Sequence, residues 1–138
     1  LDDIIVTPLK RIPTIGGDVL HILKKSHNGY NGFGEAYFSL VEPGTIKAWK
    51  RHLRMTLNLV VPLGRVRFVF HDLRTNSFRE ECLGEQEYKR LTVPPNIWFG
   101  FQGKADVVSL LFNLADIEHD PGEVERKKQE EILHDWDK

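Results

Sequence analysis

Turn-forming residues recur at short intervals along this chain and leave room only for short extended segments. The turns are marked by Gly16-Gly17, Asn28-Gly29, Asn31-Gly32, Pro43-Gly44, Pro62-Leu63-Gly64, Pro94-Pro95-Asn96 and Pro121-Gly122. The segments between them are rich in β-branched and aromatic residues: Val19–Lys24, Gly34–Val41, Thr45–Val61, Arg65–Asp72, Tyr88–Val93 and Val107–Leu114. Many short strands at this spacing are typical of an all-β sandwich or barrel. The Pro62-Leu63-Gly64 turn between two such segments predicts a hairpin.

The last 22 residues differ from the rest in charge. They carry eight acidic and four basic residues, a net charge of −4 against +3 for the remainder. One or two helical turns are predicted from the spacing of Val124, Lys127/Lys128, Glu131 and Ile132, and Leu133 and Trp136 add apolar contacts. At 138 residues we expect a single barrel domain over residues 1–121, with a solvated C-terminal helix or tail over residues 122–138 resting on it. A lid or a dimer arm is the alternative for this tail.

The overall charge and the apolar pattern exclude several classes of partner. Nineteen Lys and Arg residues against 20 Asp and Glu leave a net charge of −1, so we expect neither a nucleic-acid nor a membrane partner. No apolar run approaches the ~20 residues that cross a bilayer, and Leu1-Asp2-Asp3 lacks the layout of a signal peptide. The single cysteine, Cys82, fits a reducing compartment. We therefore expect a cytoplasmic protein.

Positive charge is concentrated in residues 47–74, which hold seven Lys and Arg residues against the single acidic residue Asp72. Strand alternation places Lys50, His52 and Arg54 on one face of their segment, and Arg67 opposite the apolar residues of the next. In an open sandwich these polar faces would be solvated. In a barrel they would line the lumen and attract a polyanionic small molecule. The pattern alone leaves both possibilities open.

Four segments, taken in order, resemble the dTDP-4-dehydrorhamnose 3,5-epimerase family of nucleotide-sugar enzymes. They are Gly44–His52 (Gly-Thr-Ile-Lys-Ala-Trp-Lys-Arg-His), Val60–Arg74, Ser77-Phe78 and Leu91–Phe101. The family carries Arg-Gly-Leu-His-x-Gln, a Gly-containing hairpin with a strand ending Asp-x-Arg, Ser-Pro-Thr, and Ile-Pro-Pro-Gly-x-x-His-Gly-Phe. Order and spacing agree over about residues 16–121. The resemblance implies a cupin-type jelly-roll barrel, a homodimer, a nucleotide-diphosphate sugar as ligand, and no cofactor.

The departures from the family pattern fall on its catalytic positions. The family's histidine base falls on Lys50 and its second histidine on Phe99, while its lysine falls near Leu57 and its tyrosine acid on Phe112. Epimerisation at C3 and C5 needs a base, a group that stabilises the enolate, and an acid on the opposite face. We therefore expect no ordinary 3,5-epimerase activity.

Lys50 and His52 are the candidate catalytic pair, because residues two apart on a strand point to the same face. A lysine among other cations in a partly buried pocket can have a lowered pKa and act as a base. His52 titrates near neutrality and can serve as an acid or a base. The alternative is that Lys50 only neutralises phosphate and His52 only forms a hydrogen bond in the lumen.

The candidate substrate-binding residues are polar or aromatic side chains around this pair. The stretch Gly34–Ser39 aligns with a family segment that holds the nucleotide, and Lys47 replaces a phosphate-binding arginine. The complete set is Glu35, Tyr37, Lys47, Arg54, Asn58, Arg67 and Trp98. We expect no metal site, because Lys50 replaces the first histidine of the His-x-His pattern of metal-binding cupins.

The resemblance implies a divergent nucleotide-sugar epimerase or isomerase. Its substrate would be a 4-keto-6-deoxysugar nucleotide, used in the biosynthesis of a polysaccharide such as the O-antigen of lipopolysaccharide. Two other classes stay open: a catalytically inactive sugar-nucleotide-binding protein that kept the pocket, and a scaffold protein of the same pathway. Cations that line a pocket favour the enzyme or the inactive binding protein, and cations that face solvent favour the scaffold protein.

Overall fold

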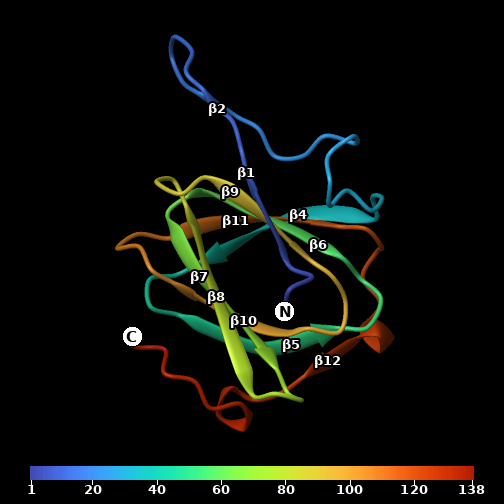
Figure 1. Cartoon of the computed structure of the whole chain (residues 1–138). Coiled ribbons are helices and arrows are strands. Elements are labelled where there is room, and N and C mark those ends of the chain that lie inside the picture. The colour runs from blue at the N-terminus through green and yellow to red at the C-terminus, as the bar shows by residue number, and fades with distance from the viewer.

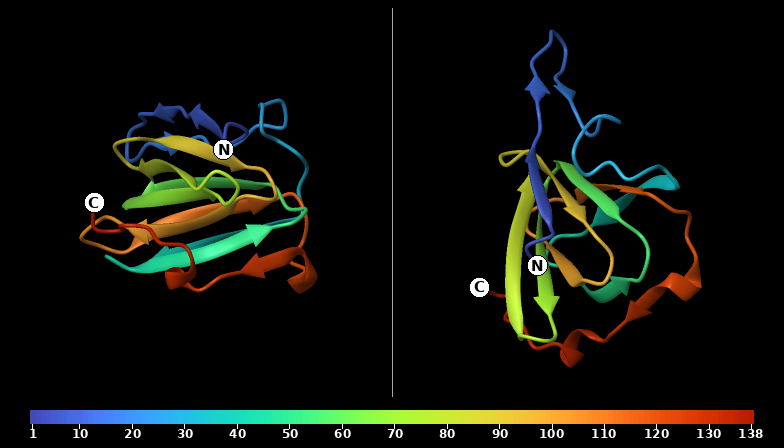
Figure 2. Two further views of the ribbon diagram at one scale, coloured as in Figure 1. Left: turned by 60° about the horizontal axis from the view of Figure 1, so that its bottom comes forward. Right: turned by 45° about the vertical axis from the view of Figure 1, so that its right-hand side comes forward.

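The computed structural model describes all 138 residues, and its centre is a pair of five-stranded antiparallel sheets stacked face to face (Figures 1 and 2). The first sheet has the strand order β1 (Ile5–Pro8), β9 (Lys89–Val93), β6 (Leu57–Leu63), β11 (Ser109–Ala115) and β4 (Glu35–Val41). The second has the order β12 (Val124–Arg126), β5 (Ile46–His52), β10 (Trp98–Gly103), β7 (Arg65–Asp72) and β8 (Ser77–Gly84). The short strands β2 (Arg11–Ile12) and β3 (Val19–Leu20) form an arm that projects from the barrel. The predicted all-β, cupin-type jelly roll is confirmed.

The main core lies between the two sheets and is built by alternate residues of their strands. On β7, Val66, Phe68 and Phe70 are fully buried in this core, whereas Arg67 and His71 point to the opposite face. This alternation was predicted, but Arg67 and His71 on the polar face of β7 neither line the lumen nor meet solvent, and only Arg65 at the start of the strand is exposed. The rest of this face is covered by the C-terminal tail.

The predicted hairpin at Pro62-Leu63-Gly64 is wrong, because β6 and β7 belong to different sheets. The connection between them passes from one sheet to the other through Gly64, whose φ is +87°. A Cβ at this position would lie 2.2 Å from Ser109 Oγ, so glycine is required for the close approach as well as for the backbone conformation. The true hairpin joins β7 to β8, with Asp72 opposite Ser77.

The segment Thr45–Val61, predicted as one strand, is two strands that lie in different sheets. β5 ends at His52 and β6 begins at Leu57. The turn between them is held by long-range acceptors: Glu123 accepts the backbone N–H of Met55 at 3.2 Å, and Asp116 accepts that of Thr56 at 2.8 Å. A local pattern cannot reveal these partners, which lie 60 or more residues away.

Two buried arginines attach the chain ends to the outer faces of the sheets. Arg90 is fully buried and donates to the carbonyls of Ile22 (2.8 Å) and Asn28 (3.0 Å), which holds the N-terminal segment on the first sheet. Arg67 is also buried and donates to Gln102 (2.8 Å) and to the backbone carbonyls of Trp136 and Lys138. Because a buried guanidinium must keep its hydrogen bonds, each arginine fixes the segment above it.

The tail contains the one or two predicted helical turns as separate 3-10 turns and forms no continuous α-helix. Its helical content is two 3-10 turns, η1 (Pro121–Glu123) and η2 (Gln129–Glu131). Between them β12 pairs with the free edge of β5, and Lys127 exchanges two backbone hydrogen bonds of 3.0 Å with Trp49. The tail thus completes a sheet edge, since unpaired strand edges are ready templates for pairing. The division between residues 1–121 and 122–138 stays a prediction.

Further along the tail, Ile132 and Trp136 pack on a second apolar cluster with Trp49, Val69 and Trp98. The tail runs along the outer side of the second sheet (Figure 1), and this cluster packs between the two. No helix in the structure has the length and apolar character that a membrane crossing requires.

Candidate functional site

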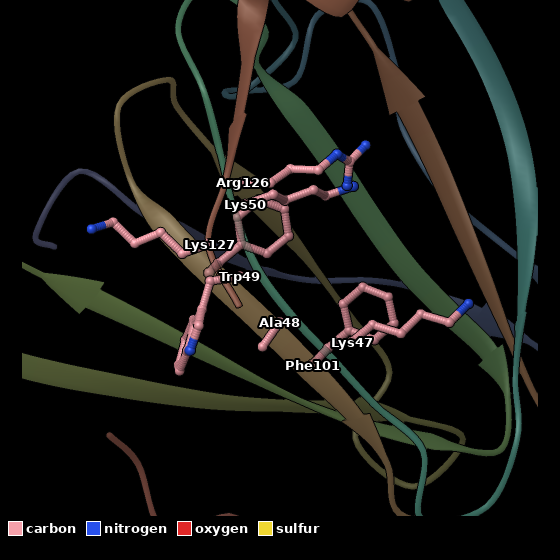
Figure 3. Close-up of a pocket in the computed structure, with 8 residues that line it drawn as sticks. Lys47, Ala48, Trp49, Lys50, Phe101, Arg126 and Lys127 are labelled. Atoms are coloured by element: carbon pink, nitrogen blue, oxygen red, sulfur yellow. The ribbon is translucent and has the colours of Figure 1, made fainter. Parts of the chain in front are cut away.

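A pocket of about 330 Å³ opens where the tail strand β12 meets β5 and β10 (Figure 3). It is lined by Lys47, Ala48, Trp49, Lys50, Phe99, Phe101, Arg126 and Lys127. Four of these residues are cationic and none is acidic. A concave site with aromatic walls and charges of one sign attracts a polyanionic ligand of moderate size.

A bulge in β5 brings the inward cations together. Lys50 lies opposite Phe99 and Lys47 opposite Phe101, but the register shifts between these pairs and leaves Trp49 as the extra residue. Strict alternation would place Lys47 and Lys50 on opposite faces. In Figure 3 both side chains extend to the same side, whereas Trp49 points away from them.

The tail strand adds Arg126, which lies opposite Lys50 in the pairing of β12 with β5. Its guanidinium extends to the same side as the amine of Lys50 (Figure 3). Lys127 also lines the pocket, but its ammonium turns to the other side and lies 5.3 Å from the centre of the Trp98 ring. Three cations, Lys47, Lys50 and Arg126, therefore face the ligand space.

Lys50 is buried against an aromatic wall, with its Nζ 5.5 Å from the centre of the Phe99 ring. Burial lowers the pKa of its amine, and the charges of Arg126 and Lys47 lower it further. The more distant carboxylate of Glu123 opposes this shift without reversing it. The Lys50 amine therefore gives up its proton more readily than an exposed lysine.

A smaller cavity of about 40 Å³ lies deeper in the barrel, and Lys50 lines it as well. Its walls are mostly apolar, and its polar side chains are Tyr37, Ser39 and Asn113. Asn113 donates to the Tyr37 hydroxyl at 2.9 Å, while its Oδ1 is buried without a partner. The Tyr37 proton and the Asn113 oxygen are thus free to bond a ligand hydroxyl.

His52 forms a buried pair with Glu123. The Nδ1 atom of His52 lies 2.5 Å from a carboxylate oxygen of Glu123, whose side chain is only 2% exposed. The other carboxylate oxygen accepts the backbone N–H of Arg54 at 3.3 Å and that of Met55 at 3.2 Å. The Nε2 atom of His52 is buried and has no hydrogen-bond partner. The ring does not line the pocket, but it lies 6.4 Å from the ring of Phe99, which does.

The environment shifts the pKa of both partners. Burial lowers the pKa of His52, and the hydrogen bond and charge of Glu123 raise it only in part. For Glu123, burial raises the pKa, but the hydrogen bonds from His52 and from the backbone of Arg54 and Met55 outweigh burial and lower it. The pair therefore joins a carboxylate to a histidine with an unoccupied Nε2, the arrangement of an oriented general base.

Among solved structures, a dTDP sugar isomerase from Desulfovibrio desulfuricans is similar to the chain over nearly its whole length. The two are 36% identical with a TM-score of 0.93, and the alignment covers 99% of this chain and 92% of the other. The chain belongs to the family of dTDP-4-dehydrorhamnose 3,5-epimerases and related nucleotide-sugar isomerases.

Two other proteins are similar to this chain, one in sequence and one in structure. A probable low-salt glycan biosynthesis epimerase of Haloferax volcanii is 32% identical over 84 residues, which are 56% of this chain. The match spans about half the length of that relative, 54%. A histidine-to-asparagine mutant of the 3,4-ketoisomerase QdtA from Thermoanaerobacterium thermosaccharolyticum, in complex with TDP-4-keto-6-deoxyglucose, has a TM-score of 0.77 over 92% of this chain and 89% of its own. At 17% identity it shows the fold alone. No model of a protein family matches the chain.

The structure of this family member brings some of the predicted site residues together. Lys47 and Lys50 line the pocket, Tyr37 lines the deeper cavity with Lys50, and His52 lies behind Phe99. Glu35 begins β4 and shares the face of Tyr37 by alternation, although it lines neither cavity.

Four predicted substrate-binding residues lie outside the pocket. Arg54 is exposed and pairs with Asp120 at 2.9 Å. Asn58 is buried on the outer face of the first sheet, where it accepts from Arg90 and Thr92 and donates to the Gly29 carbonyl. Arg67 holds the tail, and Trp98 packs beneath it between the cations Arg51 and Lys127. The polar groups of Arg54, Asn58 and Arg67 already have these structural partners, whereas the Trp98 ring is held by packing and its Nε1 is buried without a hydrogen-bond partner. None of the four lines the pocket, so we leave them out of the site.

The family's tyrosine position was placed on Phe112, whose ring instead packs on Phe38 at 5.5 Å, outside the barrel. The inward neighbour on the same strand is Asn113.

Sequence reasoning missed three residues of the site: Glu123, Arg126 and Asn113. Arg126 begins a run of three cations, Arg126-Lys127-Lys128, in an otherwise acidic tail, and that run was a usable signal. Glu123 and Asn113 carry no comparable signal, since their partners are set only by the folded chain. No group of three or more His, Cys, Asp or Glu side chains is arranged to hold a metal ion.

Proposed function

We propose that this family member is a divergent epimerase or ketoisomerase that acts on a 4-keto-6-deoxysugar nucleotide, in the biosynthesis of a polysaccharide such as the O-antigen of lipopolysaccharide. The observation that carries the proposal is that a cationic pocket and a small cavity share Lys50, Phe99 and Phe101 as lining residues. The similar dTDP sugar isomerase, the TDP-4-keto-6-deoxyglucose held by QdtA and the glycan biosynthesis epimerase support this substrate class.

The positions of the charged residues indicate how the two ends of such a ligand would be oriented. Its diphosphate would bind Lys47 and Arg126 at the pocket, because guanidinium and ammonium groups form strong charge-assisted hydrogen bonds to phosphate oxygens. The sugar would then point inward, where Tyr37 and Asn113 can bond its hydroxyl groups. This orientation places the sugar ketone beside the Lys50 amine.

Lys50 and His52 are the groups proposed to move protons. Isomerisation next to a ketone begins with removal of a proton from the adjacent carbon. The free Nε2 of His52 can accept it, through one water or after the Phe99 side wall moves, while Glu123 keeps the proton of His52 on Nδ1. Ordinary 3,5-epimerisation is not proposed, because a lysine occupies the position of the family's histidine base.

The second candidate is a sugar-nucleotide-binding protein without catalysis. It is favoured by one observation: His52 Nε2 is closed off from the pocket. The inward cations would bind the diphosphate equally well in this case. A scaffold role receives less support, because Lys47 and Lys50 both line a pocket, although the Lys47 side chain is also exposed to solvent.

Proton NMR in deuterated water separates these functions. The protein is added to dTDP-, UDP- and GDP-linked 4-keto-6-deoxysugars, and the C3 and C5 proton signals are followed. Catalysis is supported if the wild-type protein causes the loss of either proton signal and the His52→Asn variant does not. Line broadening with every proton retained supports the binding protein. No binding to any of these nucleotides contradicts both.

We also propose that the protein is a homodimer. Phe38 and Leu40 on β4 are 60% and 65% exposed, and Ile15 lies fully exposed at the tip of the projecting arm. Exposed apolar groups of this kind favour burial against a second copy. Sedimentation equilibrium tests this, and a monomer at micromolar concentration would contradict it. The cytoplasmic location predicted from the lone Cys82 stays a prediction.

A further inference from the structure

The position of the Lys50 amine suggests a role beyond proton transfer. Lys50 lines both the cationic pocket and the deeper cavity, so its side chain borders both spaces. In the proposed orientation the phosphates lie on one side of this amine and the sugar on the other. We propose that Lys50 forms a Schiff base with the ketone of the sugar nucleotide, so that isomerisation proceeds through an enamine. This inference rests on the proposed function and specifies the role of Lys50 within it.

The surroundings of Lys50 favour nucleophilic attack. Its Nζ lies over the ring of Phe99 at 5.5 Å, and nothing in its environment acts on it through a hydrogen bond. Two cations, Lys47 and Arg126, flank it on the neighbouring strand positions. Desolvation and adjacent positive charge are the two ways in which proteins activate a lysine as a nucleophile. A lysine held as a phosphate ligand alone would gain nothing from the apolar wall.

The deeper cavity also favours an iminium over an enolate. Its walls are largely Leu and Phe side chains, with Tyr37, Ser39 and Asn113 as the polar groups. An enolate oxygen would carry a full negative charge into these apolar surroundings, which is costly unless it is paired. An iminium nitrogen instead takes up the electron pair of the broken C–H bond and becomes a neutral enamine. The only charged oxygen is the short-lived one of the attack step, which the proton from the Lys50 nitrogen neutralises, so no enolate has to be held next to the apolar walls.

The steps balance without any additional reactant. The lone pair of neutral Nζ attacks the ketone carbon, the C=O π pair moves to oxygen, and a proton passes from nitrogen to that oxygen to give a carbinolamine. Protonation of the hydroxyl releases water and leaves the C=N⁺ iminium. Loss of a proton from the neighbouring carbon to His52 gives the enamine. A proton from water then adds to that carbon from the other face, which inverts the carbon and restores the iminium, and His52 returns its proton to the hydroxide that this leaves. Water then adds to the iminium and releases the ketone and the Lys50 amine.

Reductive trapping tests the proposal directly. The protein is incubated with dTDP-4-keto-6-deoxyglucose and sodium cyanoborohydride, which reduces an iminium to a stable secondary amine. Peptide mass spectrometry then locates the adduct. We expect one adduct per chain, on Lys50, and more than a tenfold loss of it in Lys50→Arg, because guanidinium cannot form the iminium. The matched control Lys104→Arg changes an exposed lysine that lines neither cavity and should keep the adduct.

A second readout follows the ketone oxygen. Each cycle of Schiff-base formation exchanges this oxygen with water, so the protein should accelerate ¹⁸O incorporation from labelled water above the spontaneous rate, and Lys50→Arg should abolish the acceleration. Circular dichroism confirms that the variant is folded.

The outcomes separate this proposal from the proposed function. Deuterium exchange at C3 or C5 without an adduct and without accelerated ¹⁸O exchange overturns the Schiff base and leaves the isomerase. An adduct located on Lys47 instead of Lys50 also overturns it. Failure of all three readouts, with no binding, overturns both proposals together.

Discussion

Replacing Glu123 by glutamine is expected to disable His52 while the fold and the pocket stay in place. One carboxylate oxygen of Glu123 accepts from His52 Nδ1, and the other accepts the backbone N–H groups of Arg54 and Met55. Glutamine has nearly the same shape but only one oxygen, so it cannot serve both sets of donors. Two backbone donors outweigh one ring donor, and the amide NH₂ group is therefore left facing His52.

This orientation changes the tautomer of His52. With a donor opposite it, Nδ1 must act as an acceptor, so the proton of the neutral ring moves to Nε2. That nitrogen can then no longer take a proton from the sugar. General-base catalysis contributes about 10²–10⁴-fold to rates, and we expect deuterium incorporation to fall by a factor in that range. Binding should change only a few-fold, because Glu123 lines neither cavity.

The effect on stability is set by the same hydrogen bonds. Losing the charge-assisted bond to His52 should lower the free energy of unfolding by about 1.5–3 kcal/mol in Glu123→Gln. Glu123→Ala leaves the backbone donors of Arg54 and Met55 unpaired as well, and removal of one partner from a buried ionic pair costs about 3–5 kcal/mol. Urea denaturation at pH 7 measures both values. Glu123→Gln should lose less stability than Glu123→Ala. A variant that stays folded but loses activity then shows that the loss of catalysis is not a loss of folding.

The assay combines deuterium incorporation with ¹⁵N NMR, which reports directly which ring nitrogen of His52 carries the proton. Glu125→Gln is the matched control, because Glu125 is a half-exposed neighbour paired with Arg51 and should leave the rate unchanged. A wild-type exchange rate in Glu123→Gln, or an Nδ1-protonated His52 in its spectrum, would refute this reasoning.

Three further perturbations test other parts of the structure. Arg126→Gln should weaken binding of a nucleoside diphosphate by about tenfold or more, the value of one charge-assisted hydrogen bond, whereas Lys127→Gln should change calorimetric affinity little. Trp136→Ala should lower the free energy of unfolding by about 2–3 kcal/mol, less than the ~3–5 kcal/mol of a closed core, because the tail can detach; denaturant titration measures it. Folding lowers the pKa values of Glu123 and His52. The folded protein is therefore most stable at a pH above the unfolded-state pKa of each group, and it loses stability as the pH falls below that value. The melting temperature should therefore fall below the ordinary pKa of 6.5 for His52 and again below 4.5 for Glu123, and a flat profile between pH 8 and 4 would contradict this.

Strands that alternate apolar and polar residues were predictable from the sequence, and a strand with large apolar side chains on both faces was not. β7 alternates core phenylalanines with Arg67 and His71, so its pattern gave the strand and its inward residues. β10 reads Trp-Phe-Gly-Phe-Gln-Gly, with Phe99 in the main core and Trp98 under the tail, and it shows no alternation of apolar and polar residues. A strand buried on both faces loses the period of two that identifies it.

The site was predictable only as far as local geometry determines it. Lys50 and His52 were singled out because they are two residues apart on one strand, and the structure places both on the inner side of β5. The bulge at Trp49, which brings Lys47 to the same side, has no mark in the sequence. Arg67 seemed equivalent to the pocket cations by charge, and only the docked tail shows that its hydrogen bonds are already used.

The C-terminal tail links the candidate site to the outer face of the second sheet. It supplies Glu123, which orients His52, and Arg126, which faces Lys50 across the β12–β5 pair. Its far end is held by Arg67 and by the packing of Trp136, which lie on the opposite side of the sheet from the barrel core. Because β12 is only three residues long, its pairing with β5 depends on these distant anchors. The same contacts that stabilise the tail therefore set the charge of the pocket and the tautomer of its histidine.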